Sequence, residues 1–166
     1  YLDGEDIKVA SDVGPGNCLI DLVAMRDFGM PHDEDGKIAA TGQIDQRLLN
    51  SLLDKIGTKS YPRADDKSFY YNLDELKSDK PENLLATLCE LTALCISDFC
   101  HSCDMPAEIL LHGGGTKNNF LMERLEKNIG SSLKFTDHLI PSKFVESAAF
   151  AYLAYLKRGL LVEPRR

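Results

Sequence analysis

The chain has 166 residues and a mass of 18.4 kDa, the size of a single domain, and its 43% hydrophobic residues are enough for one core. Charged residues make up 27% without a biased tract, which excludes a disordered or fibrous protein. Nineteen Lys and Arg against 26 Asp and Glu give a net charge of −7. Because no basic stripe is present, we expect no nucleic acid partner.

Nothing in the sequence points to a membrane or to secretion. No apolar run approaches the roughly 20 residues that span a bilayer, and no basic and apolar leader opens the chain. The five cysteines are an odd number in a chain that needs no disulfide staples. We therefore expect a cytoplasmic protein without a membrane partner. Residue 1 is Tyr and leads almost directly into a strand pattern, so we expect a piece of a longer chain.

The first third of the chain predicts a strand, a turn and two helices. Residues 7–11 alternate apolar and polar like a half-buried strand, and a turn with two glycines follows. Residues 18–28 carry apolar residues at helical spacing up to a glycine, which ends the helix. Residues 30–42 form a polar loop or a short irregular helix. Residues 44–56 predict a second helix with one apolar face, capped by Gly57.

A long loop and a long helix are predicted next. Residues 58–72 contain Pro62 and several charges, and loops of this length in compact domains are usually functional or mobile. Residues 78–82 place Pro in the first turn behind a capping acid, which is typical of a helix start. The helix behind them runs to Phe99.

The last third of the chain predicts alternating strands and helices. Short strands are expected over residues 108–112, as a buried strand, and over residues 133–137. A triple-glycine turn and a helix over residues 118–127 separate the two strands, and a last helix covers residues 145–158. Strands that alternate with helices favour an α/β architecture with parallel pairing and right-handed crossovers.

The turn at residues 12–17 has the design of an anion site. In α/β sheets, ligands lie beyond the carboxyl ends of strands, and glycine loops before helix N-termini cradle anions. Gly14 and Gly16 would let the backbone approach a phosphate, and the helix that opens at Asn17 would present free N–H groups. Asp12, at the strand tip, would act as a base or hold Mg²⁺ through water. An ordinary strand-to-helix turn with Asn17 as the cap remains open.

The turn at residues 112–118 repeats this design. Three consecutive glycines are entropically costly and are seldom kept for a plain turn. They permit flat, close contact with a base or a sugar, while Thr116, Lys117 and Asn118 supply polar groups. The segment is not a Walker loop, and a tight connection without a ligand remains open. Two such turns about a hundred residues apart together favour a nucleotide site.

Three further signals are weaker. Cys100 and Cys103 have the C-x-x-C spacing of redox and zinc sites, but the chain lacks the second pair of a structural zinc site, so we expect no metal site in the protein itself. Glu146 begins the last helix, where an acid usually complements the dipole, although one aimed at a cleft would bind a sugar hydroxyl. His32 and the acids of residues 33–35 are expected to be solvated surface.

These motifs together resemble the C-terminal lobe of the anhydro-N-acetylmuramic acid kinase family, within the sugar kinase and actin superfamily. The resemblance runs in the right order over nearly the whole chain. The matched segments are D-V-G-P-G-N-C-L-I-D from Asp12, D-G-K-I-A-A-T-G from Asp35, A-T-L-C-E-L-T-A from Ala86, H-G-G-G-T-K-N-N-F-L-M-E-R-L from His112 and V-E-S-A-A-F-A-Y-L-A from Val145.

The resemblance implies that residues 1–166 form the C-terminal lobe of an actin-like α/β fold, with a mostly parallel sheet flanked by helices. The family uses ATP, Mg²⁺ and water to open the 1,6-anhydro ring of anhydro-N-acetylmuramic acid and to phosphorylate O6. The product is N-acetylmuramic acid 6-phosphate, and the reaction serves the recycling of bacterial cell walls.

The resemblance also implies a role for each candidate residue. Asp12 matches the catalytic base, and Glu146 matches a residue that binds the sugar, so Glu146 is expected to point into the cleft near Asp12. The implied nucleotide-binding residues are Gly14, Gly16 and Asn17 at the β- and γ-phosphates, Gly113, Gly114 and Gly115 at the adenosine, and Asn118 close to the ribose or phosphates.

The chain departs from the family pattern in three ways. Val13 replaces a Thr or Cys, and His112 replaces a Cys. The family motif K-S-T-G-R-E is replaced by R-A-D-D-K-S from Arg63, with Lys67 at the position of an Arg, so no ligand role is carried over there. The N-terminal lobe and the family's C-terminal tail are absent from this sequence, and we expect the chain alone to be inactive.

Two other functions remain open. The first is that the chain is a non-catalytic nucleotide-binding or dimerisation lobe. The second is that it is part of another sugar kinase of the same superfamily. A homodimer is left open as well.

Overall fold

The computed structural model describes all residues except 5, 57–59, 72–75, 131–132, 142–143 and 157–166. The predicted cap Gly57 and the last residues of the predicted C-terminal helix lie outside the described residues. The helices are α1 (Cys18–Phe28), α2 (Gln46–Ile56), α3 (Lys67–Tyr71), α4 (Pro81–Ser102), α5 (Asn119–Ile129) and α6 (Val145–Leu156). Short 3₁₀ turns are η1 (Glu34–Gly36), η2 (Ala39–Thr41), η3 (Gly114–Lys117) and η4 (Thr136–His138).

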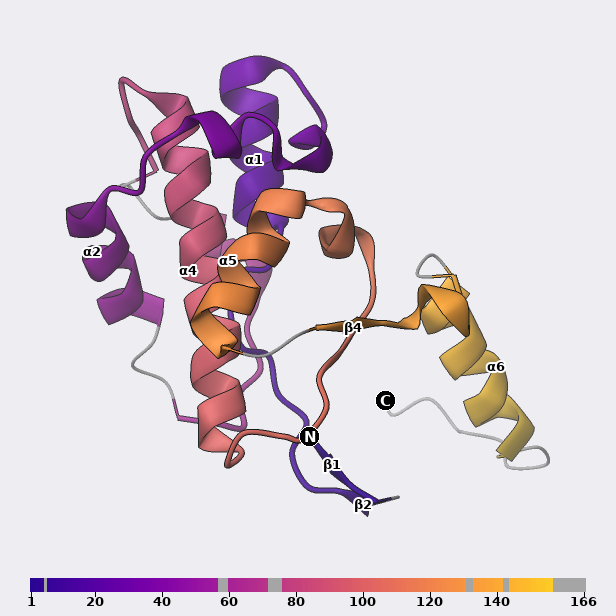
Figure 1. The fold of residues 1–166 in the computed structure, drawn as a ribbon. Coiled ribbons are helices and arrows are strands. Elements are labelled where there is room, and N and C mark those ends of the chain that lie inside the picture. Colours follow the sequence, from indigo (N-terminus) through magenta and orange to yellow (C-terminus); the bar gives the residue numbers. More distant parts are fainter. Residues whose placement is uncertain (5, 57–59, 72–75, 131–132, 142–143, 157–166) are drawn as a thin grey trace, which may run out of the picture.

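Helix α4 is the centre of the protein (Figure 1). It packs against α1, α2 and α5, and its buried residues lie on every side of the helix rather than on one face. A helix surrounded by other elements has to be apolar all round, which explains its Leu- and Cys-rich sequence. By length and composition α4 would cross a membrane, but 72% of its apolar stretch is buried inside the protein. It is therefore a core helix here.

The surrounding helices bury one face each, and α1 ends where the sequence predicts, while α5 ends at Ile129, two residues beyond the predicted end. Gly29 ends α1 and Gly130 ends α5, each with a left-handed φ, of 67° and 73°, that glycine adopts without strain. Arg124 of α5 forms an ion pair with Glu90 of α4, and both side chains are largely buried. This pair joins the two helices that share the most extensive contact in the structure.

The strands are shorter and more exposed than predicted. β3 (Leu110–Leu111) and β4 (Lys134–Phe135) form a parallel pair, while β1 (Leu2–Asp3) and β2 (Asp6–Ile7) form an antiparallel hairpin. The expected strand over residues 7–11 is wrong beyond Ile7, and the expected buried strand is wrong in its burial, since Leu110 is 51% exposed. A pair of such short strands buries too little surface to support a wider sheet. In the described residues, the predicted mostly parallel sheet is therefore present only as these two separate pairs.

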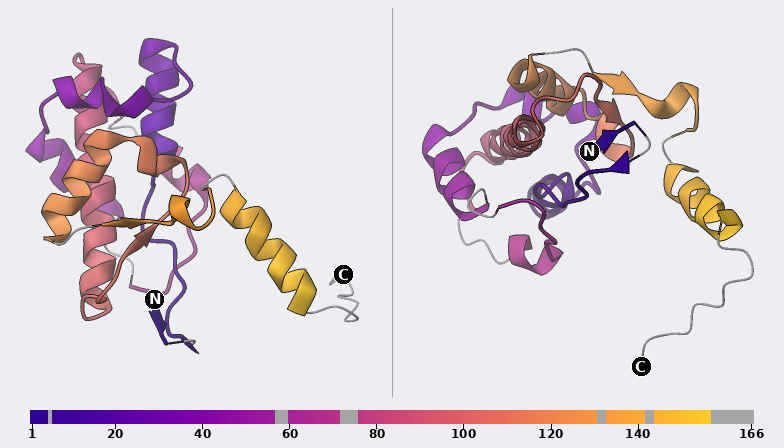
Figure 2. Two further views of the ribbon diagram at one scale, coloured as in Figure 1. Left: turned by 45° about the vertical axis from the view of Figure 1, so that its right-hand side comes forward. Right: turned by 90° about the horizontal axis from the view of Figure 1, so that it is seen from below.

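Helix α6 stands apart from the helical body (Figures 1 and 2). Phe150 is 72% exposed and Tyr152 is 61% exposed, although α6 has an apolar sequence. Apolar side chains are thus buried in α4 and exposed in α6.

Candidate functional site

The loop at residues 12–17 lies directly on helix α4. Thr92 of α4 donates a hydrogen bond from Oγ1 to the carbonyl oxygen of Gly16 at 3.0 Å. A Cβ atom placed on Gly14 would lie 2.9 Å from Cβ of Cys95, closer than packed carbon atoms tolerate. Gly14 is therefore required by this close approach, and Gly16, with φ of 55°, by its backbone conformation.

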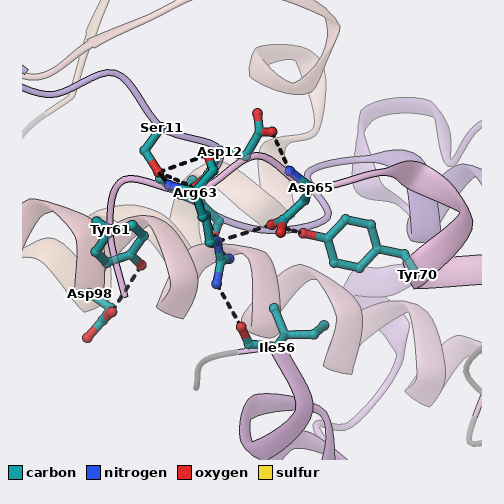
Figure 3. Close-up of polar contacts among 9 residues, drawn as sticks. Ser11, Asp12, Ile56, Tyr61, Arg63, Asp65, Tyr70 and Asp98 are labelled. Atoms are coloured by element: carbon teal, nitrogen blue, oxygen red, sulfur yellow. Dashed lines mark hydrogen bonds and ion pairs between the residues drawn. The ribbon is translucent and has the colours of Figure 1, made fainter. Parts of the chain in front are cut away.

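The segment at residues 61–65 returns to the other side of the same loop (Figure 3). The N–H of Asp12 donates to the carbonyl oxygen of Arg63 at 2.9 Å, and the N–H of Arg63 donates to Oγ of Ser11 at 2.8 Å. The N–H of Asp65 donates to Oδ2 of Asp12 at 2.8 Å. The candidate base is thus held through its carboxylate as well as through its backbone.

The guanidinium of Arg63 extends this network. It donates to the carbonyl oxygens of Asp12, Val13 and Ile56, and it pairs with Oδ2 of Asp65, 3.1 Å from Nε. The Arg63 side chain is 5% exposed and the Asp65 side chain 3%. Tyr70 donates from its hydroxyl to the same carboxylate at 2.6 Å, and burial together with this bond raises the pKa of Tyr70.

The loop at residues 112–118 is held mainly by bonds within itself, and Nδ2 of Asn118 also donates to Sγ of Cys89 on α4 at 3.7 Å. Gly113 has φ of 94°, and Thr116 donates from both N–H and Oγ1 to the Gly113 carbonyl oxygen. Asn118 caps α5, since its Oδ1 accepts from the N–H of Leu121 at 2.9 Å. The side chain of Asn118 is buried, so this cap fixes how α5 begins.

A cavity of about 400 Å³ lies between α1, the η1 segment and this second loop. It is lined by Asn17, Ile20, Asp21, Pro31, His32, Asp33, Glu34, Asp35, Gly114, Lys117 and Asn118. Three residues predicted to bind a nucleotide, Asn17, Gly114 and Asn118, are thus brought together across about a hundred residues of sequence. Gly115 also lies close, because a Cβ on it would be 3.4 Å from the Asn17 side chain.

The chemistry of the cavity is acidic with polar ends. Oδ1 of Asn17 is buried and accepts no hydrogen bond from the described residues. Burial raises the pKa of Asp21, and the nearby His32 opposes that shift. Lys117 supplies the one ammonium group among the lining residues, against four carboxylates. A buried acceptor without a partner costs free energy, so a ligand that donates to Asn17 would be stabilised here.

The prediction of solvated surface at residues 33–35 is wrong for Asp33. This residue is 4% exposed, and its two carboxylate oxygens accept from the N–H groups of Ile38 and Ala39 at 2.9 and 2.8 Å. These bonds fold the segment that walls the cavity. An Asp shortly before a short helical turn was the available signal, because Asp side chains commonly bond to nearby backbone N–H groups.

Six predicted site residues are not among those that line the cavity, namely Asp12, Gly14, Gly16, Gly113, Gly115 and Glu146. Asp12 is exposed, and Gly14 and Gly16 are partly buried in the first loop. Glu146 is exposed on α6 and is not among the residues that line the cavity. The expectation that Glu146 points into a cleft near Asp12 depends on where α6 lies, and in this structure α6 stands away from the helical body.

The contact of Arg63 and Asp65 with Asp12 was not predicted from the sequence, in which the two residues stand only as a departure from the family motif. No local pattern pairs residues about 50 positions apart.

Cys100 and Cys103 are both buried free thiols at the end of α4, and burial raises the pKa of Cys100.

Comparison with known proteins identifies the family. The family model for anhydro-N-acetylmuramic acid kinase matches residues 2–161. Among curated proteins of that name, one from Pseudomonas savastanoi pv. phaseolicola is 35% identical over 157 residues, covering 87% of this chain and 42% of the relative. One from Pelagibacter ubique is 34% identical over 163 residues, covering 92% and 43%. One from Rhodopseudomonas palustris is 34% identical over 164 residues, covering 96% and 44%.

The chain therefore spans less than half the length of these curated relatives. A family match over nearly all residues, together with the two glycine loops facing one cavity, leads to one assignment. The chain belongs to the anhydro-N-acetylmuramic acid kinase family.

Proposed function

We propose that the whole protein is an ATP-dependent kinase that opens the anhydro ring of anhydro-N-acetylmuramic acid with water and phosphorylates O6. The observation that carries this proposal is the cavity in which Asn17 of the first loop meets Gly114 and Asn118 of the second. Family membership supports the substrate, because the relatives are named as kinases of that sugar.

The cavity suits the nucleoside end of ATP better than the phosphates. Its four carboxylates would repel a triphosphate, but they accept hydrogen bonds from ribose hydroxyls and from an amino group of adenine. We place the adenosine beside Gly114 and Asn118, with the phosphates leaving past Lys117 toward Gly14 and Gly16.

Asp12 is proposed as the general base. Its carboxylate is exposed at the start of the first loop, and one oxygen, Oδ2, is held by the N–H of Asp65. The other oxygen would take a proton from the water that attacks the anomeric carbon. As that C–O bond forms, the bond from the anomeric carbon to O6 breaks. O6 then takes the γ-phosphoryl group, and ADP leaves.

Mg²⁺ is the expected companion of ATP in this proposal. Mg²⁺ prefers hard oxygen ligands, which the phosphates of ATP and water would supply, so that Asp12 stays available as the base. The ion, when bound, would neutralise charge between the β- and γ-phosphates.

The finer features implied by the family belong to the same proposal. They are an actin-like two-lobe fold in which residues 1–166 form the C-terminal lobe, a cytoplasmic location, and a homodimer. A sugar contact from Glu146 rests on the resemblance alone, since in this structure α6 stands apart from the helical body.

The test is Asp12→Asn in the complete protein, with ATP binding measured separately. We expect phosphorylation of the anhydro sugar to fall by roughly 10²–10⁴-fold while the dissociation constant for ATP stays within about twofold. The 166-residue chain alone should bind ATP and form no phosphosugar. Wild-type turnover of Asp12→Asn would show that another group is the base.

A further inference from the structure

We propose that Arg63 is a positioning residue for the Asp12 carboxylate, acting through the main chain of residues 63–65. This inference rests on the proposed role of Asp12 as the base. It concerns a segment in which the chain departs from the family motif, and which the sequence analysis left without a role.

The guanidinium of Arg63 contacts several acceptors at once. One guanidinium donates to three backbone carbonyl oxygens, of Asp12, Val13 and Ile56, and forms an ion pair with the carboxylate of Asp65. Two of those carbonyls belong to the loop that carries the proposed base. The side chains of the Arg63–Asp65 ion pair are 5% and 3% exposed, so water has little access to this pair.

The backbone of Asp65 contacts the side chain of Asp12. The N–H of Asp65 donates directly to Oδ2 of the Asp12 carboxylate at 2.8 Å (Figure 3). The Asp65 side chain is in turn held by Arg63 and by the hydroxyl of Tyr70, at 3.1 and 2.6 Å. Removing the guanidinium therefore loosens both the backbone of Asp12 and the amide that orients its carboxylate.

The shape of the Arg63 side chain matters as well. The four acceptors lie around a planar, forked donor, and a Lys ammonium has no such fork, so it cannot reach all of them at once. Arg63→Lys therefore tests the fork itself, because it keeps the positive charge and removes the forked arrangement of donors.

A structural role and a positioning role differ in what they change. An ion pair that only stabilises the fold lowers the fraction of folded protein. A positioning pair changes the turnover of the folded fraction, because a base displaced by about 1 Å loses up to roughly 10²-fold in rate while substrates still bind.

The experiment compares Arg63→Lys and Arg63→Ala with Arg124→Lys and Arg124→Ala in the complete protein. Arg124 is the matched control, since it also forms a largely buried ion pair, with Glu90, but lies outside both glycine loops. Folded fraction, kcat, and KM for ATP and for the anhydro sugar are measured for each variant.

We expect kcat of folded Arg63→Lys to fall by roughly 10- to 100-fold with each KM within about twofold. Guanidinium at tens of millimolar should restore part of the lost kcat in Arg63→Ala, while ammonium at the same concentration should not. The Arg124 variants should keep wild-type kcat per folded molecule and gain nothing from guanidinium.

Tyr70→Phe decides the matter if the Arg63 variants do not fold. It removes one bond to Asp65 without removing a charge, and we expect a severalfold loss of kcat with unchanged KM. Wild-type kcat in folded Arg63→Lys, or in Tyr70→Phe where Arg63→Lys does not fold, overturns the inference. If Asp12→Asn also keeps its turnover, the proposed base itself is wrong, whereas loss of turnover in Asp12→Asn alone removes only the role of Arg63.

Discussion

The two glycine loops are held in place by different means. The loop at residues 12–17 is gripped from both sides by residues far away in sequence, with Thr92 and Cys95 of α4 on one side and Arg63 on the other. The loop at residues 112–118 is held mainly by its own residues, through Thr116 and the cap at Asn118, with one bond from Nδ2 of Asn118 to Sγ of Cys89 on α4 at 3.7 Å.

This difference matters for what each loop is able to do. A loop held by distant segments keeps one geometry only while those segments stay packed, which suits a group that must be aimed at a reacting atom. A loop held mainly by its own residues is less sensitive to change elsewhere in the protein and suits the flat contact of a nucleoside. We therefore expect remote substitutions to disturb the first loop more than the second.

Breaking the ion pair behind the first loop should have the largest effect. Asp65→Ala leaves the Arg63 charge buried without its carboxylate, so we expect the free energy of unfolding to fall by about 3–5 kcal/mol. Urea unfolding followed by circular dichroism measures this change. Lys37→Ala is the control, because Lys37 forms an ion pair that is open to solvent, and it should leave the stability unchanged. A loss for Asp65→Ala below about 1 kcal/mol would contradict a tightly held first loop.

A matched pair of glycine substitutions sharpens the comparison. Gly14→Ala places a methyl group 2.9 Å from Cβ of Cys95, and we expect a cost of about 1–3 kcal/mol as the loop moves off α4. Gly114→Ala meets no atom within 4 Å, so its stability should stay within about 0.5 kcal/mol of wild type.

Thermal unfolding and ATP titration of both variants measure these effects. Because Gly114 has open space around it, a weaker ATP affinity in Gly114→Ala would report contact with the nucleotide rather than a packing defect. Equal stability losses in the two variants would show that the loops are held alike.

The smallest expected effect is a pH dependence at Tyr70. The hydroxyl bond to Asp65 is worth about 1.5 kcal/mol, which Tyr70→Phe removes at neutral pH. Because burial and this bond raise the pKa of Tyr70, the folded state holds the hydroxyl proton more tightly than the unfolded chain, where the pKa is about 10. The stabilisation is thus complete below about pH 10 and is lost as pH rises above it.

Unfolding free energies from about pH 7 to 11 check this, since other groups titrate equally in both proteins. The difference between wild type and Tyr70→Phe should be constant up to about pH 9 and shrink above about pH 10. A difference that stays constant to the highest pH would mean that Tyr70 does not hold Asp65.

Local sequence determined the long helices and the two loops, but not the short α3, which lies in the segment predicted as a long loop. The apolar spacing of α1, α2 and α5 and the glycines that end α1 and α5 are visible within a few residues, because helix formation depends on neighbours three and four positions apart. The glycine turns at residues 12–17 and 112–118 were equally visible, and with them the family. Their candidate residues Asn17, Gly114 and Asn118 do line one cavity.

Only the tertiary structure decided which segments support those loops. The strand pattern at residues 7–11 and the buried strand at residues 108–112 depended on sheet partners that the described residues do not supply, since strands form by pairing at a distance. The burial of Asp33 and the exposure of α6 likewise depend on what packs against them. The contact between Arg63 and Asp12 has the same cause. A hydrogen bond between residues 51 apart leaves no periodic pattern in the sequence, because only folding brings the two residues together.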